Sequence, residues 1–403
     1  MPGLLITGAS VFSANGVIEN GAVLVDEGRI THIGPAAALA HRAAPGHEVI
    51  DGHGHLLLPG FIDLQVNGAG GRLFTGDPSQ ETLTAMSTAL ASTGCTAFLP
   101  TVISAPLDQM ARAASAAAQA TPLPQPGARV LGSHLEGPFL NPARSGAHQR
   151  SHLRLPNQTE IHSLLDSGEG TVRLTTLAPE LPGASALIAE AAAHGCAIAI
   201  GHTEATAEDT AAVVEAGATL VTHLFNAMPP LQARAPGVAG AALAGVVPFA
   251  TLITDGIHAH PLAVASAVRA MGTDRVILVT DAMPPVATEL REFDLQSRRV
   301  LVRDGACYLE DGTLSGSILT MNKAVHNMLR MTGVSLPEAV GMASANPARA
   351  LGIDNRKGSL AQGMDADLVL CTTDLDVLLT AVEGHVVYRS PLYRNPQPTA
   401  AGQ

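Results

Sequence analysis

The chain has 403 residues, of which 46% are hydrophobic and 14% are charged, and this composition excludes a disordered protein. Lysine and arginine total 23 against 35 aspartates and glutamates. The net charge of -12 argues against a basic surface for nucleic acid or anionic membrane over the whole chain. No apolar run approaches the ~20 residues that span a bilayer, and the N-terminus lacks a cationic secretory signal, so we expect a cytoplasmic protein.

Both ends of the chain are predicted to be rich in short strands. The predicted strands are residues 4–7, 22–25 and 30–34 near the N-terminus, and 367–370 and 384–388 near the C-terminus. Gly16, Gly21 and Gly28 are expected to supply the turns of the first group. Because a different pattern separates the two groups, we expect one small β-sandwich domain built from residues 1–58 plus 355–403.

The middle of the chain alternates between short apolar runs and alanine-rich stretches of helical length. The runs are residues 60–66, 96–102, 129–136, 172–177, 197–202, 219–224, 250–254 and 275–280. Residues 207–216 are one predicted helix, with Thr206 as its N-cap, and Ser335 and Glu338 have the spacing of a capping box at the start of another. These repeats predict an α/β fold with a (β/α)8 barrel over residues 59–354; a doubly wound sheet would leave strands unexplained.

Polar and ionisable residues follow the predicted barrel strands. They are Gln65, Asn67, Glu136, Glu180, His202, His223, Asp255, His258 and Asp281. The carboxyl ends of barrel strands converge on one cavity, so these side chains are expected to meet there. One carboxylate and two neutral imidazoles suit a catalytic zinc ion with an open position for water. A lone histidine at a strand end is more often structural, and spacing alone leaves the structural and metal-hydrolase interpretations about equal.

The local sequence around these residues carries a resemblance. Residues 59–67, Pro-Gly-Phe-Ile-Asp-Leu-Gln-Val-Asn, resemble the first barrel strand of the amidohydrolase superfamily. Further stretches resemble the N-acetylglucosamine-6-phosphate deacetylases of that superfamily: residues 134–141 (HLEGPFLN), 201–203 (GHT), 222–228 (THLFNAM), 255–258 (DGIH), 279–283 (VTDAM) and 312–317 (GTLSGS). They occur in the family's order, and the resemblance runs from about residue 4 to about residue 390.

The resemblance implies metal-dependent hydrolysis of the acetamide of N-acetyl-D-glucosamine 6-phosphate, giving D-glucosamine 6-phosphate and acetate in amino-sugar catabolism. It also implies a homodimer and the following roles. The metal ligands are Glu136, His202 and His223; the catalytic acid and base is Asp281; His148 contacts the substrate carbonyl; Asn226, Ala227, Arg234 and His258 contact the sugar phosphate; and Leu314, Ser315 and Gly316 close over the sugar. In some relatives the arginine that matches Arg234 comes from the neighbouring subunit.

The first barrel strand bears on the number of metal ions. Superfamily members with two metals usually carry His-x-His there, with a bridging carboxylated lysine or a glutamate. This chain has Gln65 and Asn67 at those positions, and its only lysines, Lys323 and Lys357, are not near a predicted strand end. Because amides are poor zinc ligands, we predict one divalent ion per subunit, zinc in the first place and iron as the alternative.

Three alternatives remain to be separated from this hypothesis. The first is a deacetylase of another N-acetylated amino-sugar phosphate, such as the galactosamine epimer. A cyclic amidohydrolase is disfavoured because the histidine pair and strand-end lysine are missing, and a non-catalytic scaffold protein would typically have lost the ligands. Residues 284–287 depart from the family pattern and residues 288–299 are unusually charged, so the loop over the sugar, and with it sugar specificity, stays open.

Several other polar residues have structural interpretations that outweigh functional ones. His53, His194 and His260 are expected to serve as turn, helix-end or surface groups. Asp63 is expected to fix strand register or support the site, not to act as the base. For Glu180, two roles are equally favoured: a turn residue, and a group that supports the site from near the cavity.

Overall fold

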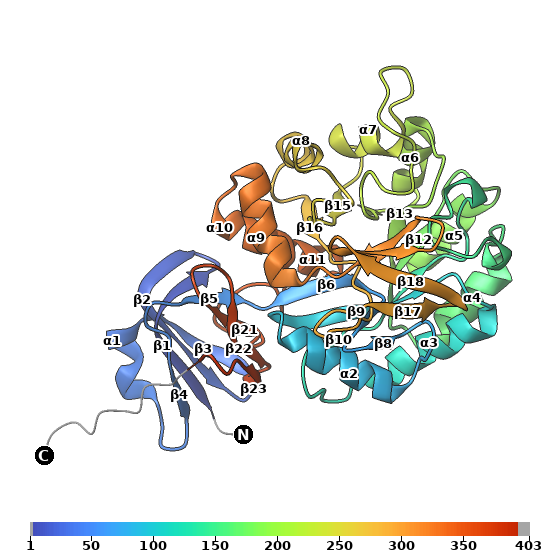
Figure 1. Ribbon diagram of the computed structural model, residues 1–403. Helices are drawn as coiled ribbons and strands as arrows, with labels where there is room; N and C mark the ends of the chain where they lie inside the picture. Colours follow the sequence, from blue (N-terminus) through green and yellow to red (C-terminus); the bar gives the residue numbers. More distant parts are fainter. Residues whose placement is uncertain (1–2, 394–403) are drawn as a thin grey trace, which may run out of the picture.

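The computed structural model describes residues 3–393, and its centre is a barrel of parallel strands (Figure 1). The eight strands, in order around the barrel, are β6 (Phe61–Val66), β9 (Cys95–Ile103), β11 (Ser133–Glu136), β12 (Val172–Leu177), β13 (Ala197–Ile200), β14 (Leu220–Val221), β15 (Phe249–Leu252) and β16 (Val276–Leu278). Each strand pairs in parallel with the next. Asp63 accepts hydrogen bonds from the backbone N–H and hydroxyl of Thr280, which bring the two ends of the sheet together.

Helices surround these strands, as the alanine-rich stretches predict. They are α2 (Gln80–Ala91), α3 (Leu107–Ala120), α4 (Gln158–Ser167), α5 (Ala184–Ala193), α6 (Ala207–Glu215), α7 (Gly237–Leu243), α8 (Pro261–Met271), α9 (Met321–Thr332), α10 (Leu336–Ala343) and α11 (Ala345–Ala350). Reciprocal capping boxes of Thr206 with Asp209 and of Ser335 with Glu338 begin α6 and α10, which confirms both predicted starts. In residues 3–393, none of the helices has the length and apolar character to cross a bilayer.

One predicted barrel strand is divided in two. Residues 129–136 form β10 (Arg129–Val130) and β11, which are separated at Gly132. Gly132 has φ of 132°, and a Cβ atom there would lie 2.0 Å from the carbonyl oxygen of Thr171. The chain can make this close approach only with glycine, and the break lets β11 pair with β12 in a shifted register.

Strands from both chain ends share one sheet beside the barrel (Figure 1). Its order is β23 (His385–Arg389), β22 (Val377–Val382), β21 (Leu368–Cys371), β5 (Leu56–Pro59), β1 (Leu4–Ser13), β2 (Gly16–Asp26) and β3 (Arg29–Pro35), with β4 (Glu48–Asp51) paired to β1 and the short α1 (Ala36–Leu39) after β3. Gly16 and Gly28 lie at turns with positive φ. The prediction of a turn at Gly21 is wrong, because Gly21 lies within β2 opposite Ala9, where the register shifts. The predicted fold class, a barrel with a strand-rich unit from both chain ends, is confirmed.

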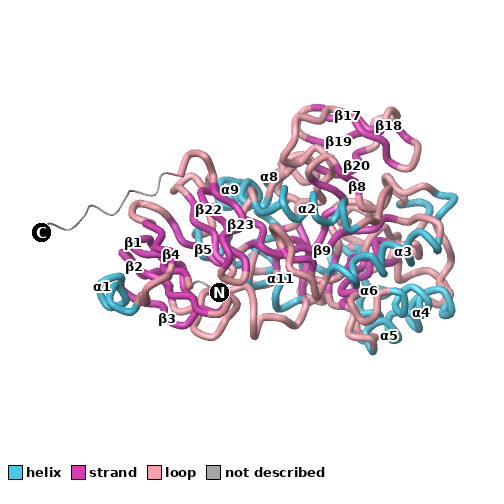
Figure 2. The backbone as a smooth tube through the Cα atoms, turned by 90° about the horizontal axis from the view of Figure 1, so that it is seen from below, coloured by secondary structure: helices cyan, strands magenta, loops and turns pink. Residues whose placement is uncertain are grey.

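A second small sheet was not predicted. It contains β17 (Glu292–Leu295), β18 (Arg298–Arg303), β19 (Ala306–Leu309) and β20 (Leu314–Ser317), which follow one another as an antiparallel meander. Figure 2 shows it beside β8 (Arg72–Leu73), which forms a short hairpin with β7 (Gly68–Ala69). The charged segment of residues 288–299 therefore builds strands of an inserted sheet, which we call the meander sheet.

The buried side chain of Lys357 forms ion pairs next to the sheet that the two chain ends build. The Lys357 Nζ atom lies 2.8 Å from Asp367 Oδ2 and 3.1 Å from Asp365 Oδ2, and these three side chains are at most 8% exposed. We expect Lys357→Met to lower the free energy of unfolding by about 3–5 kcal/mol, because the buried carboxylate of Asp367 would lose its ion-pair partner, whereas Asp365 keeps Arg29 and Arg356. Denaturant unfolding measures the loss.

The only other lysine provides a matched control for this prediction. Lys323 pairs with Asp376 at 3.2 Å, but both side chains are more than half exposed. Lys323→Met should change the free energy of unfolding by about 1 kcal/mol or less, since surface ion pairs contribute little. Equal losses in the two variants would contradict the role assigned to the buried lysine.

Candidate active site

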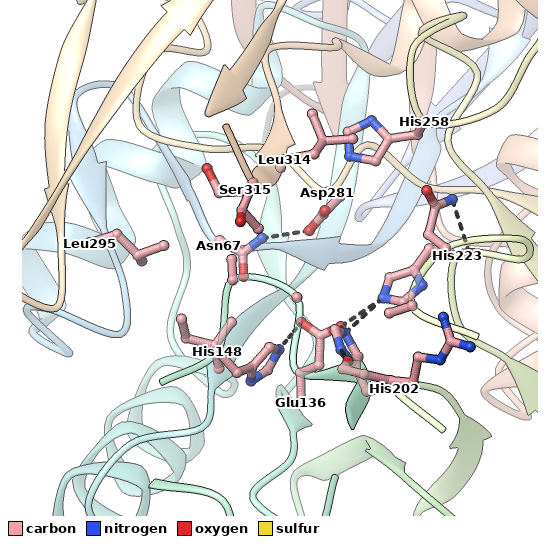
Figure 3. Close-up of a pocket in the computed structure, with 18 of the residues that line it drawn as sticks. Asn67, Glu136, His148, His202, His223, His258, Asp281, Leu295, Leu314 and Ser315 are labelled. Carbon is pink, nitrogen blue, oxygen red and sulfur yellow. Dashed lines mark hydrogen bonds and ion pairs between the residues drawn. The ribbon is translucent and has the colours of Figure 1, made fainter. Parts of the chain in front are cut away.

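The carboxyl ends of the barrel strands open into a cavity of ≈ 350 Å³ (Figure 3). The residues from the sequence-based prediction that line it are Glu136, His148, His202, His223, Asn226, Ala227, His258, Asp281, Leu314, Ser315 and Gly316. Arg234 is exposed, in the loop between β14 and α7, and does not line this cavity. The single chain thus brings together all of the predicted site except one arginine.

Three of these side chains meet at one point. The Glu136 Oε1 atom lies 3.3 Å from His202 Nε2 and 3.2 Å from His223 Nε2, and the two Nε2 atoms are 3.1 Å apart. A tetrahedral zinc ion with ligand bonds of about 2.0–2.1 Å separates its ligand atoms by about 3.3 Å. The two imidazole nitrogens and the carboxylate oxygen therefore fit one divalent metal ion.

Hydrogen bonds on the far sides of the rings distinguish a metal ligand from a donor. The Nδ1–H of His202 donates to the carbonyl of Arg144 at 2.9 Å, which leaves its Nε2 lone pair for a metal. The Nδ1 atom of His148 instead accepts from the backbone N–H of Ser104 at 3.1 Å. A neutral His148 consequently carries its proton on Nε2, 3.8 Å from Glu136 Oε2.

The pKa of His148 agrees with a neutral ring that carries its proton on Nε2. Burial and the nearby charge of His202 lower the pKa of His148 to about 3, so the imidazole is neutral near pH 7. Although Glu136, His148 and His202 offer ligand atoms within 4.8 Å of one another, the protonated Nε2 atom makes His148 a hydrogen-bond donor to a bound ligand. His148 is therefore suited to lie beside a bound metal ion as a hydrogen-bond donor and not to bind it.

Asp281 stands apart from Glu136, His202 and His223, and two side-chain amides hold its carboxylate. Asn67 Nδ2 donates to Asp281 Oδ1 at 2.7 Å, and Gln65 Nε2 donates to the same oxygen at 3.2 Å and to Glu136 Oε1 at 3.1 Å. Burial and the charge of Glu136 raise the pKa of Asp281 above the usual range of a carboxyl. A buried carboxylate of raised pKa is suited to take up and return a proton.

The backbone is unusual at several cavity positions, which include Ala227 and three that carry ionisable side chains. His202, His223 and Asp281 have φ angles of 49°, 32° and 51°, in the left-handed region that residues other than glycine seldom adopt. Each follows a barrel strand, where the chain turns sharply into the next loop. The turn directs each side chain into the cavity.

The opposite side of the cavity is polar. The ring of His258 donates from Nδ1 to Asp255 Oδ2 at 2.6 Å, so Nε2 is the nitrogen left for a ligand. Burial alone would raise the pKa of Asp255, but the hydrogen bond and charge of His258 hold it below the usual range. Asn226, Ala227 and Arg144 also line the cavity, and Arg144 pairs with Glu204.

The remaining polar residues singled out in the sequence have structural contacts. Glu180 accepts hydrogen bonds from Asn141, Thr203 and the backbone of Glu204, which ties together the loops after β11 and β13. Elsewhere, His53 pairs with Asp51, His260 caps α8, and His194 bonds to the Glu190 carbonyl; His194 also lies in an exposed group with His162 and Asp166, outside the cavity.

Sequence reasoning missed several residues that line the cavity or orient its side chains. Ser104 orients His148, Arg144 accepts from His202, and Ile103, Met283 and Leu295 supply apolar surface. A serine directly after a barrel strand is a signal that could have pointed to Ser104. Leu295 carries no such signal, because it reaches the cavity only through the meander sheet.

A parallel barrel whose strand ends gather a carboxylate and two imidazoles, next to a carboxylate outside that set, belongs to the class of metal-dependent barrel hydrolases. The sequence model described as the amidohydrolase family matches residues 56–387. The N-acetylglucosamine-6-phosphate deacetylase of Bacillus subtilis (strain 168) is 36% identical over 394 residues, 96% of this chain and 98% of the relative.

Two further proteins are similar to this chain over nearly its whole length. The N-acetylgalactosamine-6-phosphate deacetylase of Shewanella sp. (strain ANA-3) is 37% identical over 389 residues, 96% of each chain. The crystal structure of N-acetylglucosamine-6-phosphate deacetylase from Pasteurella multocida superposes with a TM-score of 0.90 at 33% identity, covering 96% of this chain and 100% of that one. The chain belongs to the amidohydrolase family and, within it, to the deacetylases of N-acetylated amino-sugar phosphates.

Proposed function

We propose that this enzyme hydrolyses the acetamide of N-acetyl-D-glucosamine 6-phosphate, giving D-glucosamine 6-phosphate and acetate in amino-sugar catabolism. The observation that carries the proposal is the position of Asp281, a buried carboxylate outside the triangle of Glu136, His202 and His223 but in the same cavity. A non-catalytic scaffold has no use for both the ligand set and a separate acid, so their joint presence supports an enzyme.

The chain's own residues can carry out the steps of amide hydrolysis. Asp281 takes a proton from the attacking water and returns it to the departing amine, which is general base and then general acid catalysis. The Nε2–H of His148 donates to the carbonyl oxygen as negative charge develops there, a contribution of about 3 kcal/mol in comparable sites. Asn67 and Gln65 hold the Asp281 carboxylate in place through their amide N–H groups.

We propose one divalent metal ion per subunit, zinc with iron as the alternative, held by Glu136, His202 and His223. When bound, such an ion lowers the pKa of water toward ~7 and polarises a carbonyl oxygen. The amides of Gln65 and Asn67 direct N–H donors to Asp281, and their remaining amide oxygens are poor ligands for zinc. This supports a single ion over a pair.

The phosphate is proposed to bind at the polar end, beside Asn226, Ala227 and His258, with Leu314, Ser315 and Gly316 over the sugar. Arg234 would reach this group from the neighbouring subunit of a homodimer, which accords with its exposed position outside its own chain's cavity. An arginine suits the task because its planar fork can bind two phosphate oxygens.

Replacing Arg234 tests the phosphate assignment. We expect Arg234→Ala to raise KM for the phosphorylated sugar by at least ~10-fold with a smaller change in kcat, because one charge-assisted contact far from the reacting bond is lost. Arg269→Ala, at an exposed arginine on α8, serves as the control and should leave both constants unchanged. An unchanged KM in Arg234→Ala would remove this residue from the phosphate site.

Acetate release from the two epimeric substrates, measured beside metal analysis of the same preparation, tests the function. The alternative substrate is N-acetylgalactosamine 6-phosphate, which is favoured by the relative from Shewanella at an identity similar to that of the Bacillus protein. Faster turnover of the glucosamine epimer with about one metal per chain would support the proposal. Faster turnover of the galactosamine epimer would instead make N-acetylgalactosamine 6-phosphate the substrate.

Three features remain predictions of the sequence. The division into residues 1–58 plus 355–403 and residues 59–354 is one, and its last part extends beyond the described residues. The homodimer and the cytoplasmic location are the others. Limited proteolysis, the mass of the protein in solution and fractionation of cells would examine them in turn.

A further inference from the structure

The reaction cavity has an apolar end that no role above explains. Ile103, Ala147, Met283 and Leu295 line it together with His148. Figure 3 shows Leu295 beyond His148 and Asn67, on the side of the cavity away from His258. The cavity therefore runs from a polar end, past the reactive groups, to an apolar end.

Leu295 is fixed firmly in that position. It ends β17 and is fully buried (0% exposed). It packs in the apolar core of the meander sheet with Ile103, Met283, Val300, Cys307 and Leu309. A side chain held in a packed core cannot move aside without cost, so it forms a rigid wall.

A second cavity, of ≈ 1150 Å³, lies behind this wall. Asp294 and Gln296 line it, whereas Leu295 between them lines the reaction cavity. Gly146, His148 and Thr313 line both cavities. At this edge, only one layer of residues separates the reaction cavity from a larger space.

The orientation of the substrate follows from the two ends, and this step rests on the proposed function. With the phosphate beside His258 and the carbonyl oxygen at the Nε2–H of His148, the substituent on the carbonyl carbon points toward Leu295. A methyl group needs the small apolar space that this end offers. A longer chain would collide with the wall.

We infer that Leu295 is the residue that limits the substrate to small N-acyl groups such as acetyl, and that the meander sheet thereby sets acyl specificity. The reaction is unchanged: the amide C–N bond breaks, water supplies the second oxygen of the released carboxylate, and the amine takes up protons as it leaves. What Leu295 determines is the length of the released acid. One methylene in such a pocket changes kcat/KM by about 10–200-fold.

The test compares N-acetyl-, N-propanoyl- and N-butanoylglucosamine 6-phosphate as substrates, with kcat/KM measured for each. In the wild-type enzyme, the value should fall by ~10-fold or more from acetyl to propanoyl. Leu295→Ala should raise the propanoyl-to-acetyl ratio at least ~10-fold, because the wall opens toward the second cavity. This ratio is measured within one preparation, so it does not depend on the fraction of the protein that is folded.

Leu309→Ala is the matched control, since Leu309 is buried in the same core but does not line the reaction cavity. It should lose comparable stability and keep the wild-type ratio. An unchanged ratio in Leu295→Ala, or an equal rise in Leu309→Ala, would overturn the inference. If Leu295→Ala does not fold, Leu295→Val is judged by the same criterion, with a smaller rise expected.

Failure of the underlying function gives a different result. A wild-type enzyme that releases acid from none of the three sugars would reject the proposed function, and the acyl inference with it. Efficient turnover by the wild-type enzyme with no discrimination among the three would reject only the inference.

Discussion

Replacing Asp281 with asparagine is expected to lower kcat at least ~10²-fold while the protein retains its metal. The substitution preserves size and the hydrogen bond from Asn67, but an amide cannot accept the proton of the attacking water or return it to the amine. Because Asp281 lies outside the Glu136–His202–His223 triangle, metal content and KM should change little. Steady-state kinetics and metal analysis of one preparation measure all three quantities.

A carboxylate remote from the cavity provides the comparison for this variant. Asp166 lies exposed on α4, so Asp166→Asn should keep full turnover. Near-normal kcat in Asp281→Asn would remove Asp281 from the role of base. Loss of the metal in that variant would instead make Asp281 a ligand.

Glu136→Gln is expected to lose the metal and at least ~10²-fold in turnover together. The substitution exchanges an anionic oxygen for a neutral amide at the point where His202 and His223 converge, and amide oxygen is a poor ligand for zinc. Metal per chain after dialysis, followed by turnover with zinc added back, measures both effects. Added zinc should restore the wild-type enzyme stripped by a chelator but not this variant at the same zinc concentration.

Glu180→Gln separates metal binding from general damage near the cavity. Glu180 also lies near the strand ends, but its oxygens bond to loop residues and not to the histidine triangle. This variant should keep about one metal per chain even where the loops loosen. Full metal content in Glu136→Gln would contradict the ligand assignment.

The barrel could be predicted because its strands are short apolar runs that end in polar residues. Residues 172–177 match β12 at both ends, and the reactive groups lie where strand ends must converge. The break at Gly132 could not be predicted, since it depends on the close approach of the carbonyl of Thr171, the residue that precedes β12. Local sequence does not contain that distance.

The apolar end of the site illustrates the same limit. Leu295 lies within a charged segment and reaches the cavity only because the meander sheet packs it against Ile103, which lies far away in the sequence. The tautomer of His148 likewise depends on Ser104, on another strand end. Arg234 differs again: the resemblance assigns it to the phosphate, yet one chain alone does not bring it to the cavity.

The left-handed backbone at His202, His223 and Asp281 has a consequence for engineering. Such conformations cost about 1 kcal/mol or more each in residues other than glycine, and the rest of the fold must offset that cost. A laboratory selection for heat resistance alone would favour glycine or asparagine at these positions, and would discard two of the proposed metal ligands and the proposed base. The substitutions that would most readily raise thermostability in this barrel are therefore ones expected to abolish activity. Screens for stable variants should measure turnover and melting temperature together.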